Sequence, residues 1–317
     1  MKGLTAIAGI KVGHASNFDA LTGCTAILCE GGAVGGVDIR GSASEASSLE
    51  TLQAGHITER VHAIVLSGGS AFGLETASGV RRYLEQHGVG FRAGRAVVPI
   101  VPCAILFDLD IGKAGVRPTR EMGESAAAAA TTDPVQEGAV GAGTGATVGK
   151  IFGMRQAMKS GAGSGLVELQ GGLLVAALAV VNAFGDVRDP ASGKLIAGAR
   201  RSPDSRELAD TEAHMKAGAG RGGFERRNTT LAVVATNARL SKVQATKLAQ
   251  LASLGMARTI YPVNTMFDGD MVFALSTGEA QADVNTLGIA AAEAVAQAVV
   301  RAVRNAPTMG GTPGLAG

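Results

Sequence analysis

Short apolar runs that alternate with helical patterns constrain the fold of this chain more than any other feature. Residues 61–67 (VHAIVLS) form a β-type run, a Gly-Gly-Ser turn follows, and residues 72–87 then show helical periodicity. Residues 165–170 and 173–181 read as a hairpin around two glycines, and residues 229–236 (TTLAVVAT) as a buried strand. Because this alternation lacks strict βαβ regularity, we predict an α/β fold in which sheets are layered with helices, and not a Rossmann sheet.

Two helices in the C-terminal part have recognisable ends. Ser241 and Gln244 have the spacing of a capping box, which predicts a helix start, and Gly255 is expected to end that helix. Asp283 is expected to cap a second, longer helix. The 46 glycines among 317 residues, with only 3% aromatic residues, indicate close backbone packing in a single domain over residues 1–317.

The charge balance argues against nucleic acid as a partner. The formal net charge is only +2, and the basic cluster at 221–227 is short and contains Glu225, so we interpret it as a solvated loop. Three cysteines are too few for a disulfide framework, which favours a reducing compartment. Lys11 interrupts the N-terminal apolar stretch, and the run at 171–184 is too short to span a bilayer. We therefore expect a cytoplasmic protein that does not bind membranes.

Several familiar motifs fail on their details. Residues 145–150 (GATVGK) resemble a phosphate-binding loop, but the first glycine is out of register and Ile151 replaces the required Ser or Thr. Ser70 follows a strand as in a nucleophile elbow, but a glycine is misplaced and none of the five histidines stands out as its partner. The Cys, His and carboxylate residues show no metal-ligand spacing. We expect neither metal nor cofactor, and a non-enzymatic Gly-rich nucleotide-binding module remains the alternative.

The clearest change of composition lies before residue 229. Residues 186–227 are rich in charged and small residues, and we predict an exposed, mobile excursion with one short helix near 205–216. Asn228 and Thr229 then enter the buried strand. This junction can be an ordinary turn and strand edge. If the bond before Thr229 breaks, however, its hydroxyl gains an α-amine on the same residue, and that amine can accept the hydroxyl proton near neutral pH.

The chain resembles the self-processing aminopeptidase family, which includes the L-aminopeptidase/D-amino-acid esterase-amidases, the β-peptidyl aminopeptidases and the nylon-oligomer hydrolases. The resemblance runs nearly from end to end, in eight blocks that keep the family order. The blocks are residues 10–14 (IKVGH), 33–41 (AVGGVDIRG), 66–73 (LSGGSAFG), 98–109 (VPIVPCAILFDL), 141–150, 180–187 (VVNAFGDV), 228–230 and 267–270 (FDGD).

This resemblance assigns roles to residues of this chain. Thr229 matches the family nucleophile, and the precursor is expected to be cut after Asn228. Asn182 matches an asparagine whose amide stabilises the oxyanion, a task that suits a neutral N–H donor at a strand end. Lys150 matches a lysine of the nylon-hydrolase branch that would depress the pKa of the Thr229 amine.

The acidic pair of the same branch corresponds to Asp268 and Asp270. One of these carboxylates would orient the Thr229 hydroxyl, and the other would pair with Lys150 or the amine. Phe107 stands where some members have a tyrosine that assists the oxyanion, so we leave it out of the site. Threonine combined with Asp-Gly-Asp places the chain nearest the nylon-hydrolase branch.

At the level of fold, the resemblance implies an αββα sandwich, with two sheets between helix layers as in N-terminal-nucleophile (Ntn) hydrolases. It further implies self-cleavage into subunits of residues 1–228 and 229–317, and a homotetramer of cleaved protomers. The substrate would be a small peptide or amide, and L- or D-amino-acid amides, β-peptides and ω-amino-acid oligomers all remain open. A self-cleaving acyltransferase of the ornithine acetyltransferase type is a second alternative.

Overall fold

The structure, a computed structural model, describes residues 2–219 and 228–317, so the basic cluster at 221–227 lies outside the described residues. The principal sheet strands are β1 (Lys11–Asn17), β2 (Thr22–Ile39), β3 (Ala46–Ser47), β4 (Val61–Ser67), β7 (Cys103–Ile105), β10 (Ala162–Glu168), β11 (Leu174–Asn182), β14 (Thr229–Ala238) and β16 (Met271–Ala280). The helices are α1 (Thr76–Gln86), α2 (Arg120–Ala128), α3 (Thr211–Lys216), α4 (Lys242–Ala257) and α5 (Val284–Arg304).

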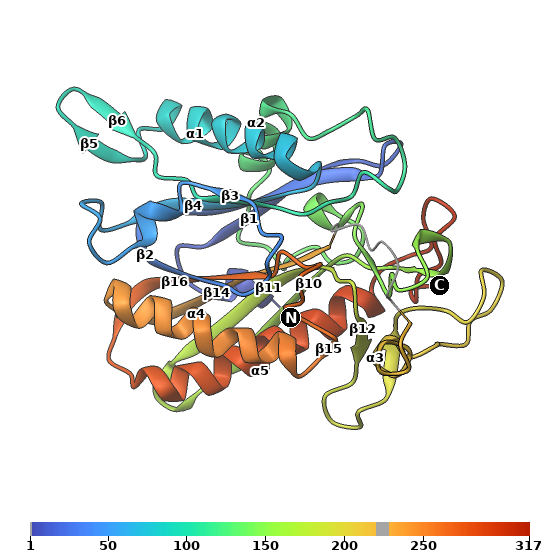
Figure 1. The fold of residues 1–317 in the computed structure, drawn as a ribbon. Helices are drawn as coiled ribbons and strands as arrows, with labels where there is room; N and C mark the ends of the chain where they lie inside the picture. Colours follow the sequence, from blue (N-terminus) through green and yellow to red (C-terminus); the bar gives the residue numbers. More distant parts are fainter. Residues whose placement is uncertain (1, 220–227) are drawn as a thin grey trace.

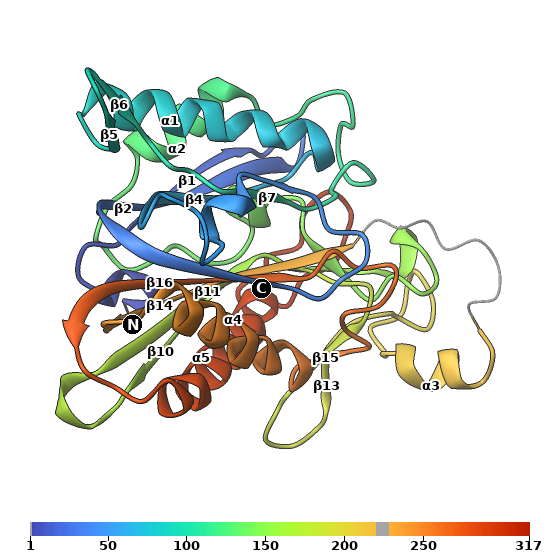
Figure 2. The same cartoon turned by 60° about the vertical axis from the view of Figure 1, so that its left-hand side comes forward.

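Four layers make up the fold (Figures 1 and 2). The strand order is β10-β11-β14-β16-β2-β4-β7-β3, and β1 also pairs with β2. The long strand β2 belongs to both layers, because residues 22–28 pair with β1 and β4 whereas residues 34–39 pair with β16. Helices α1 and α2 cover the β1–β4 layer, and α4 and α5 cover the layer of β10, β11, β14 and β16. This confirms the predicted αββα sandwich.

The alternation of side chains along the strands contributes to three of the four buried apolar clusters in the described residues. In β14, Leu231 and Val233 point into the core between the two sheets, whereas Ala232 and Val234 pack against α4 and α5. Ala26 of β2 belongs to the third core, under α1 and α2. Strands that are buried on both faces carry nearly continuous apolar sequence, which is why these runs were recognisable without a period-two pattern.

The C-terminal helices begin as predicted, but one ends later. Ser241 and Gln244 form the capping box of α4, and the Asp283 side chain caps α5. The expected end of α4 at Gly255 is wrong, because the helix continues to Ala257. A Cβ atom on Gly255 would lie 2.3 Å from the carbonyl oxygen of Ala292 in α5, so this glycine permits the close approach of the two helices.

Helix α5 is also long and apolar enough, by length and composition, to cross a membrane. In this structure 67% of its most apolar window is buried, and the helix packs against α4, β10 and β11. This burial is typical of a helix in the core of a folded domain.

The excursion at 186–227 is more ordered than predicted within its described part. It contains β12 (Asp186–Arg188) and β13 (Leu195–Ala197), which form a small sheet with β15 (Ile260–Tyr261). The remaining short strands pair as β5 (Phe91–Ala93) with β6 (Ala96–Val98), and β8 (Thr147–Val148) with β9 (Met158–Lys159). The expectation of an exposed excursion is wrong for these parts, because β12 pairs with β15 and the buried Asp186 carboxylate binds Ala199 and Thr211 farther along the same segment.

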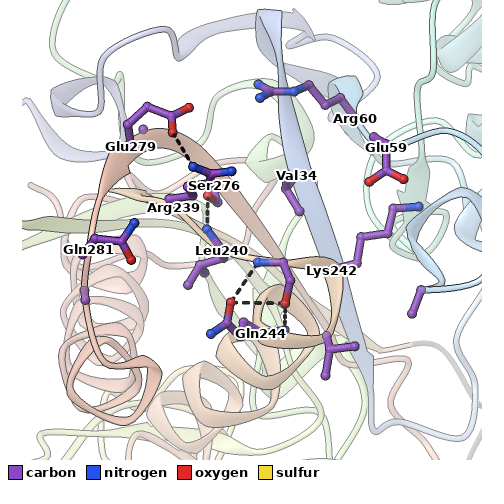
Figure 3. Close-up of a pocket in the computed structure, with 15 residues that line it drawn as sticks. Val34, Glu59, Arg60, Arg239, Leu240, Lys242, Gln244, Ser276, Glu279 and Gln281 are labelled. Atoms are coloured by element: carbon purple, nitrogen blue, oxygen red, sulfur yellow. Dashed lines mark hydrogen bonds and ion pairs between the residues drawn. The ribbon is translucent and has the colours of Figure 1, made fainter.

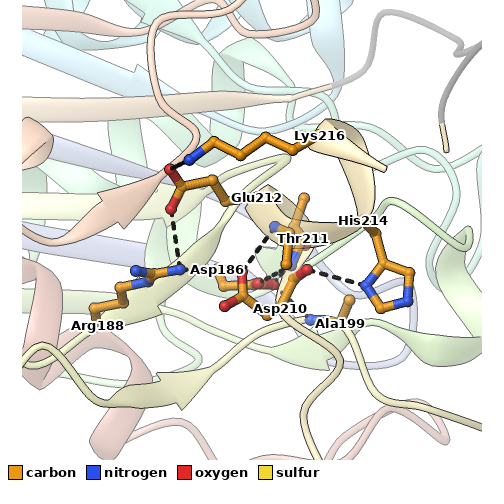
Figure 4. Close-up of polar contacts among 9 residues, drawn as sticks. Asp186, Arg188, Ala199, Asp210, Thr211, Glu212, His214 and Lys216 are labelled. Carbon is orange, nitrogen blue, oxygen red and sulfur yellow. Dashed lines mark hydrogen bonds and ion pairs between the residues drawn. The ribbon is translucent and has the colours of Figure 1, made fainter. Parts of the chain in front are cut away.

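Asp186 is the centre of that attachment (Figure 4). Its carboxylate accepts hydrogen bonds from the Ala199 N–H at 2.7 Å, the Thr211 N–H at 2.6 Å and the Thr211 hydroxyl at 2.8 Å. Arg188 adds ion pairs to Asp210 at 3.0 Å and Glu212 at 3.2 Å. Together these contacts fix α3, the last described helix before the junction at Thr229.

Replacing Asp186 with alanine is expected to lower the free energy of unfolding by about 3 kcal/mol or more, because three buried donors lose their acceptor. Asp204→Ala, at an exposed position of the same excursion, is the control, with an expected change within about 0.5 kcal/mol. Chemical denaturation of the three proteins measures both values. Equal stability of the two variants would contradict this role of Asp186.

Candidate active site

Thr229 lies at the N-terminal end of a central strand in the layer of β10, β11, β14 and β16. It is the first residue of β14, and its register partner is Asn182, the last residue of the antiparallel neighbour β11. Thr229 is only 3% exposed and Asn182 is fully buried. The strand pairing therefore brings the predicted nucleophile and the predicted oxyanion residue together, although 47 positions separate them in the sequence.

The peptide group between Asn228 and Thr229 is held from two directions. The Thr229 hydroxyl donates to the carbonyl oxygen of Asn228, with an O···O distance of 2.5 Å. The backbone N–H of Gly269 donates to the same oxygen at 2.8 Å, and Asn228 forms a parallel bridge with Asp268. Gly269 was not identified from the sequence, since its contribution is a backbone N–H, which every residue type except proline carries.

Lys150 joins this arrangement from the Gly-rich segment. Its backbone N–H donates to the Phe184 carbonyl at 2.9 Å, which places the side chain beside the end of β11. The Lys150 Nζ then lies 2.6 Å from Asn182 Oδ1 and 3.3 Å from the Asn182 carbonyl oxygen. Burial lowers the pKa of Lys150 to about 7, against the opposing effect of the nearby aspartates. A substantial neutral fraction near pH 7 makes this lysine a possible proton acceptor as well as a cation.

The two aspartates hold the backbone on both sides of the junction. Asp270 accepts from the Thr230 N–H at 2.6 Å and from the Asn264 N–H at 2.9 Å. Burial, and then the charge of Asp268, raises the pKa of Asp270. In this structure its contact is therefore with the residue after the nucleophile, and the Thr229 hydroxyl contacts the Asn228 carbonyl.

Asp268 accepts from the Phe184 N–H at 3.1 Å and from the Thr265 hydroxyl at 2.5 Å. Burial raises the pKa of this carboxyl group too, and the positive charge of Lys150 partly offsets that effect. Within the described residues, the Lys150 Nζ donates hydrogen bonds to two oxygen atoms of Asn182, and its predicted pairing with an aspartate is a through-space attraction.

The orientation of Asn182 follows from its neighbours. Its Oδ1 accepts from Lys150 and from the Thr147 N–H at 3.1 Å, so its Nδ2 points the other way, toward the Phe107 carbonyl oxygen at 2.8 Å. One of the two amide hydrogens is engaged there. Phe107, which we left out of the site, thus contributes its backbone carbonyl as a positioning group.

The structure also shows what the phosphate-loop-like segment and the elbow-like turn at Ser70 do in this fold. The segment at 141–150 brings Lys150 to Asn182, and its glycines allow close backbone approach: a Cβ atom would lie 2.3 Å from the Leu21 carbonyl oxygen at Gly145 and 1.9 Å from the Ala199 nitrogen at Gly149. Ser70 has the left-handed φ of 55° that a nucleophile elbow requires. All five histidine rings, however, contact other groups, namely Thr25, Thr58, the Ile100 N–H, the Tyr83 carbonyl and the Asp210 carbonyl. In the described part of the chain none of these ring contacts is to Ser70, so the structure shows no Ser-His pair there.

A cavity of about 730 Å³ opens at the far ends of β14 and β16 (Figure 3). Its lining includes Arg239 and Glu279, whose charges pair at 3.6 Å, and Ser276, which accepts from the Leu240 N–H at 3.1 Å. Because β14 has 10 residues, this cavity lies about 30 Å from Thr229. It is separate from the candidate active site.

Comparisons with solved structures support the fold. The chain superposes on the β-aminopeptidase of a Burkholderia species with a TM-score of 0.70 and 24% identity, covering 99% of this chain and 91% of that chain. It also superposes on the L-aminopeptidase D-Ala-esterase/amidase of Ochrobactrum anthropi with a TM-score of 0.73 and 20% identity, covering 98% and 88%. The latter is described as a variant of the Ntn-hydrolase fold.

Relatives found by sequence also align with most of this chain. An uncharacterized aminopeptidase of Mycobacterium bovis is 39% identical over 99% of this chain and 96% of the relative. The 6-aminohexanoate-oligomer endohydrolase of a Kocuria species is 31% identical over 86% of this chain and 74% of the relative. The model of peptidase family S58 matches residues 2–316. With this match over nearly the whole sequence, the chain belongs to peptidase family S58 and is a hydrolase of peptide or amide bonds, which excludes a non-enzymatic nucleotide-binding module.

Proposed function

We propose that this peptidase cuts its own chain between Asn228 and Thr229, and that the freed Thr229 is the nucleophile of an amide hydrolase. The observation that carries the proposal is the position of the Thr229 hydroxyl, which lies 2.5 Å from the carbonyl oxygen of the bond to be cut. The surroundings supply an amide donor in Asn182 and a lysine of lowered pKa in Lys150. These are the components that activation of a hydroxyl nucleophile requires.

Self-cleavage would proceed through an ester. The Thr229 Oγ attacks the Asn228 carbonyl carbon, and neutral Lys150 receives the hydroxyl proton. The C–N bond then breaks as a proton passes to the nitrogen, which becomes the free α-amine of Thr229. Water hydrolyses the ester, leaving a carboxylate on Asn228 and restoring the hydroxyl. Cyclisation of the Asn228 side chain is the alternative route for this cut.

The mature enzyme would apply the same chemistry to its substrate. Thr229 Oγ attacks the substrate amide as the α-amine takes the hydroxyl proton, the second amide hydrogen of Asn182 stabilises the oxyanion, and the amine then passes that proton to the leaving group. Water then releases the acyl group from Thr229. In the continuous chain Thr229 is 3% exposed and Asn228 is 4% exposed, so a substrate has no open path to the hydroxyl. The uncut chain is accordingly an inactive precursor.

Purified protein is expected to contain two fragments. Dividing 31.7 kDa in proportion to residue number gives about 23 kDa for residues 1–228 and about 9 kDa for residues 229–317. Denaturing electrophoresis and N-terminal sequencing test this, and the small fragment should begin Thr-Thr-Leu-Ala-Val. Only intact chain after prolonged incubation would overturn the proposal.

The substrate class we propose is a small peptide or amide, including ω-amino-acid oligomers. The 6-aminohexanoate-oligomer endohydrolases among the relatives and the Thr229 and Asp-Gly-Asp combination support the last of these. A panel of L- and D-amino-acid amides, β-dipeptides and 6-aminohexanoate oligomers distinguishes them. If an added amino acceptor outcompetes water for the acyl group, the protein is instead an acyltransferase of the ornithine acetyltransferase type.

We further infer a homotetramer of cleaved protomers in the cytoplasm, with neither nucleic acid nor membrane as partner. Support for the compartment comes from three buried cysteines that are all free thiols. Light scattering coupled to size-exclusion chromatography measures the mass of the assembly.

A further inference from the structure

We infer that the backbone N–H of Gly269 is the oxyanion donor of the self-cleavage step, and that Asn182 serves the substrate instead. This inference rests on the proposed function, because it assigns a donor to the first cut. When Thr229 Oγ attacks Asn228, negative charge develops on the Asn228 carbonyl oxygen. Gly269 N–H already lies 2.8 Å from that oxygen, within the range expected of an oxyanion donor.

Asn182 does not occupy the corresponding position in the continuous chain. Its Nδ2 donates to the Phe107 carbonyl at 2.8 Å, and its Oδ1 is fixed by Lys150 at 2.6 Å and by the Thr147 N–H. Turning the amide toward Asn228 would break these contacts. The two donors therefore face two different carbonyl groups, that of Asn228 during self-cleavage and that of a substrate afterwards.

The peptide group that carries the Gly269 N–H is held rigidly. The carbonyl of the same peptide group, on Asp268, accepts from the Ala43 N–H at 2.9 Å. Hydrogen bonding at the carbonyl end polarises an amide and strengthens its N–H as a donor. On the C-terminal side, the Asp270 carbonyl accepts from the Arg40 N–H at 3.0 Å and from the Gly41 N–H at 3.2 Å. This donor needs no reorganisation when the charge appears, which is the condition for efficient electrostatic stabilisation.

Glycine at position 269 is required by the same geometry. A Cβ atom there would lie 2.7 Å from Thr229 Oγ1 and 2.8 Å from the Ala43 carbonyl oxygen. The backbone of residue 269 therefore lies so close to the Thr229 hydroxyl that no room is left for a side chain at this position. A residue with a Cβ atom would move either the hydroxyl or the donor, although it would keep the N–H.

The test replaces this single N–H with an ester oxygen. Glycolic acid is incorporated in place of Gly269 in the full chain, which converts the 268–269 amide to an ester and leaves every side chain unchanged. Self-cleavage after residue 228 is expected to slow about 100-fold, the usual effect of losing one oxyanion donor. The rate is followed by mass spectrometry, which also separates this cut from hydrolysis of the introduced ester at 268–269.

The control is the same substitution at Gly171, in the turn between β10 and β11, where a side chain would meet nothing within 4 Å. That protein should mature at the wild-type rate. Thermal melting of both esters verifies folding. Hydroxylamine, which captures the Thr229 ester as an Asn228 hydroxamate, reports the acyl shift separately from the water step.

Three outcomes separate the role of Gly269 from self-cleavage itself. A wild-type chain that never cleaves removes the proposed function itself. A wild-type chain that cleaves, together with a folded 269 ester that cleaves as fast as the wild type both with and without hydroxylamine, overturns the role of Gly269 alone. A slow acyl shift in the 269 ester with normal maturation of the 171 ester supports it.

Discussion

A chain with Thr229→Val is expected to remain intact at 31.7 kDa and to show no amide hydrolysis. Valine keeps the shape of threonine but has no hydroxyl, so neither the first cut nor the later acyl-enzyme can form. Thr229→Ser keeps the hydroxyl and should still mature. Denaturing electrophoresis over several days of incubation, followed by the amide panel, measures both effects.

The neighbouring residue supplies a matched control. Thr230 is fully buried, and its side chain lies beside the Asp270 carboxyl group. Thr230→Val makes the same chemical change one position along the strand and keeps the backbone hydrogen bond from the residue 230 N–H to Asp270. It should cleave normally, because the Thr229 hydroxyl is unchanged. Cleavage of Thr229→Val after residue 228 would instead indicate cyclisation of Asn228.

Self-cleavage is expected to accelerate as the pH rises and to level off above about pH 7. Burial lowers the pKa of Lys150 to about 7, so below that pH the amine is mostly protonated and cannot accept the Thr229 proton. Above it, the neutral amine predominates and the rate no longer depends on its titration. Rapid transfer of precursor, accumulated at low pH, into buffers from pH 5 to 9 gives the profile.

Substitution of Lys150 should remove that dependence. Lys150→Arg retains a positive charge that is not lost in this pH range, and Lys150→Met retains neither charge nor base. Both should cleave at least ~100-fold more slowly than the wild type. Lys194→Met, at an exposed position, is the control. A Lys150→Arg chain that matures at the wild-type rate, with the wild-type pH profile, would show that Lys150 is not the acceptor.

Local sequence determined much of the fold. The apolar runs at 61–67 and 229–236 became β4 and the first part of β14, and the caps at Ser241 and Asp283 became helix starts. These features depend on neighbouring residues, so they can be read along the chain. The end of α4 could not be read in this way, because Gly255 serves the contact with α5 and not a helix cap.

Long-range contacts decided the rest. Asp186 has an ordinary acidic sequence context, and only the fold reveals that it is buried and holds Thr211 from 25 residues away. The same holds for the Gly269 N–H, because a backbone donor leaves no mark in the sequence, and for the Phe107 carbonyl at Asn182.

The sequence by itself determined which residue types were available at the junction, with Thr229 at the start of a buried strand and Lys150, Asn182, Asp268 and Asp270 at the positions of a known family. The tertiary structure decided how they meet. Pairing of β11 with β14 sets Asn182 opposite Thr229, and the segment at 268–270 fixes the Asn228 carbonyl. Burial then moves the pKa of Lys150 from 10.5 to about 7. That change arises from the loss of water around the amine, a property of the folded chain that no short stretch of sequence contains.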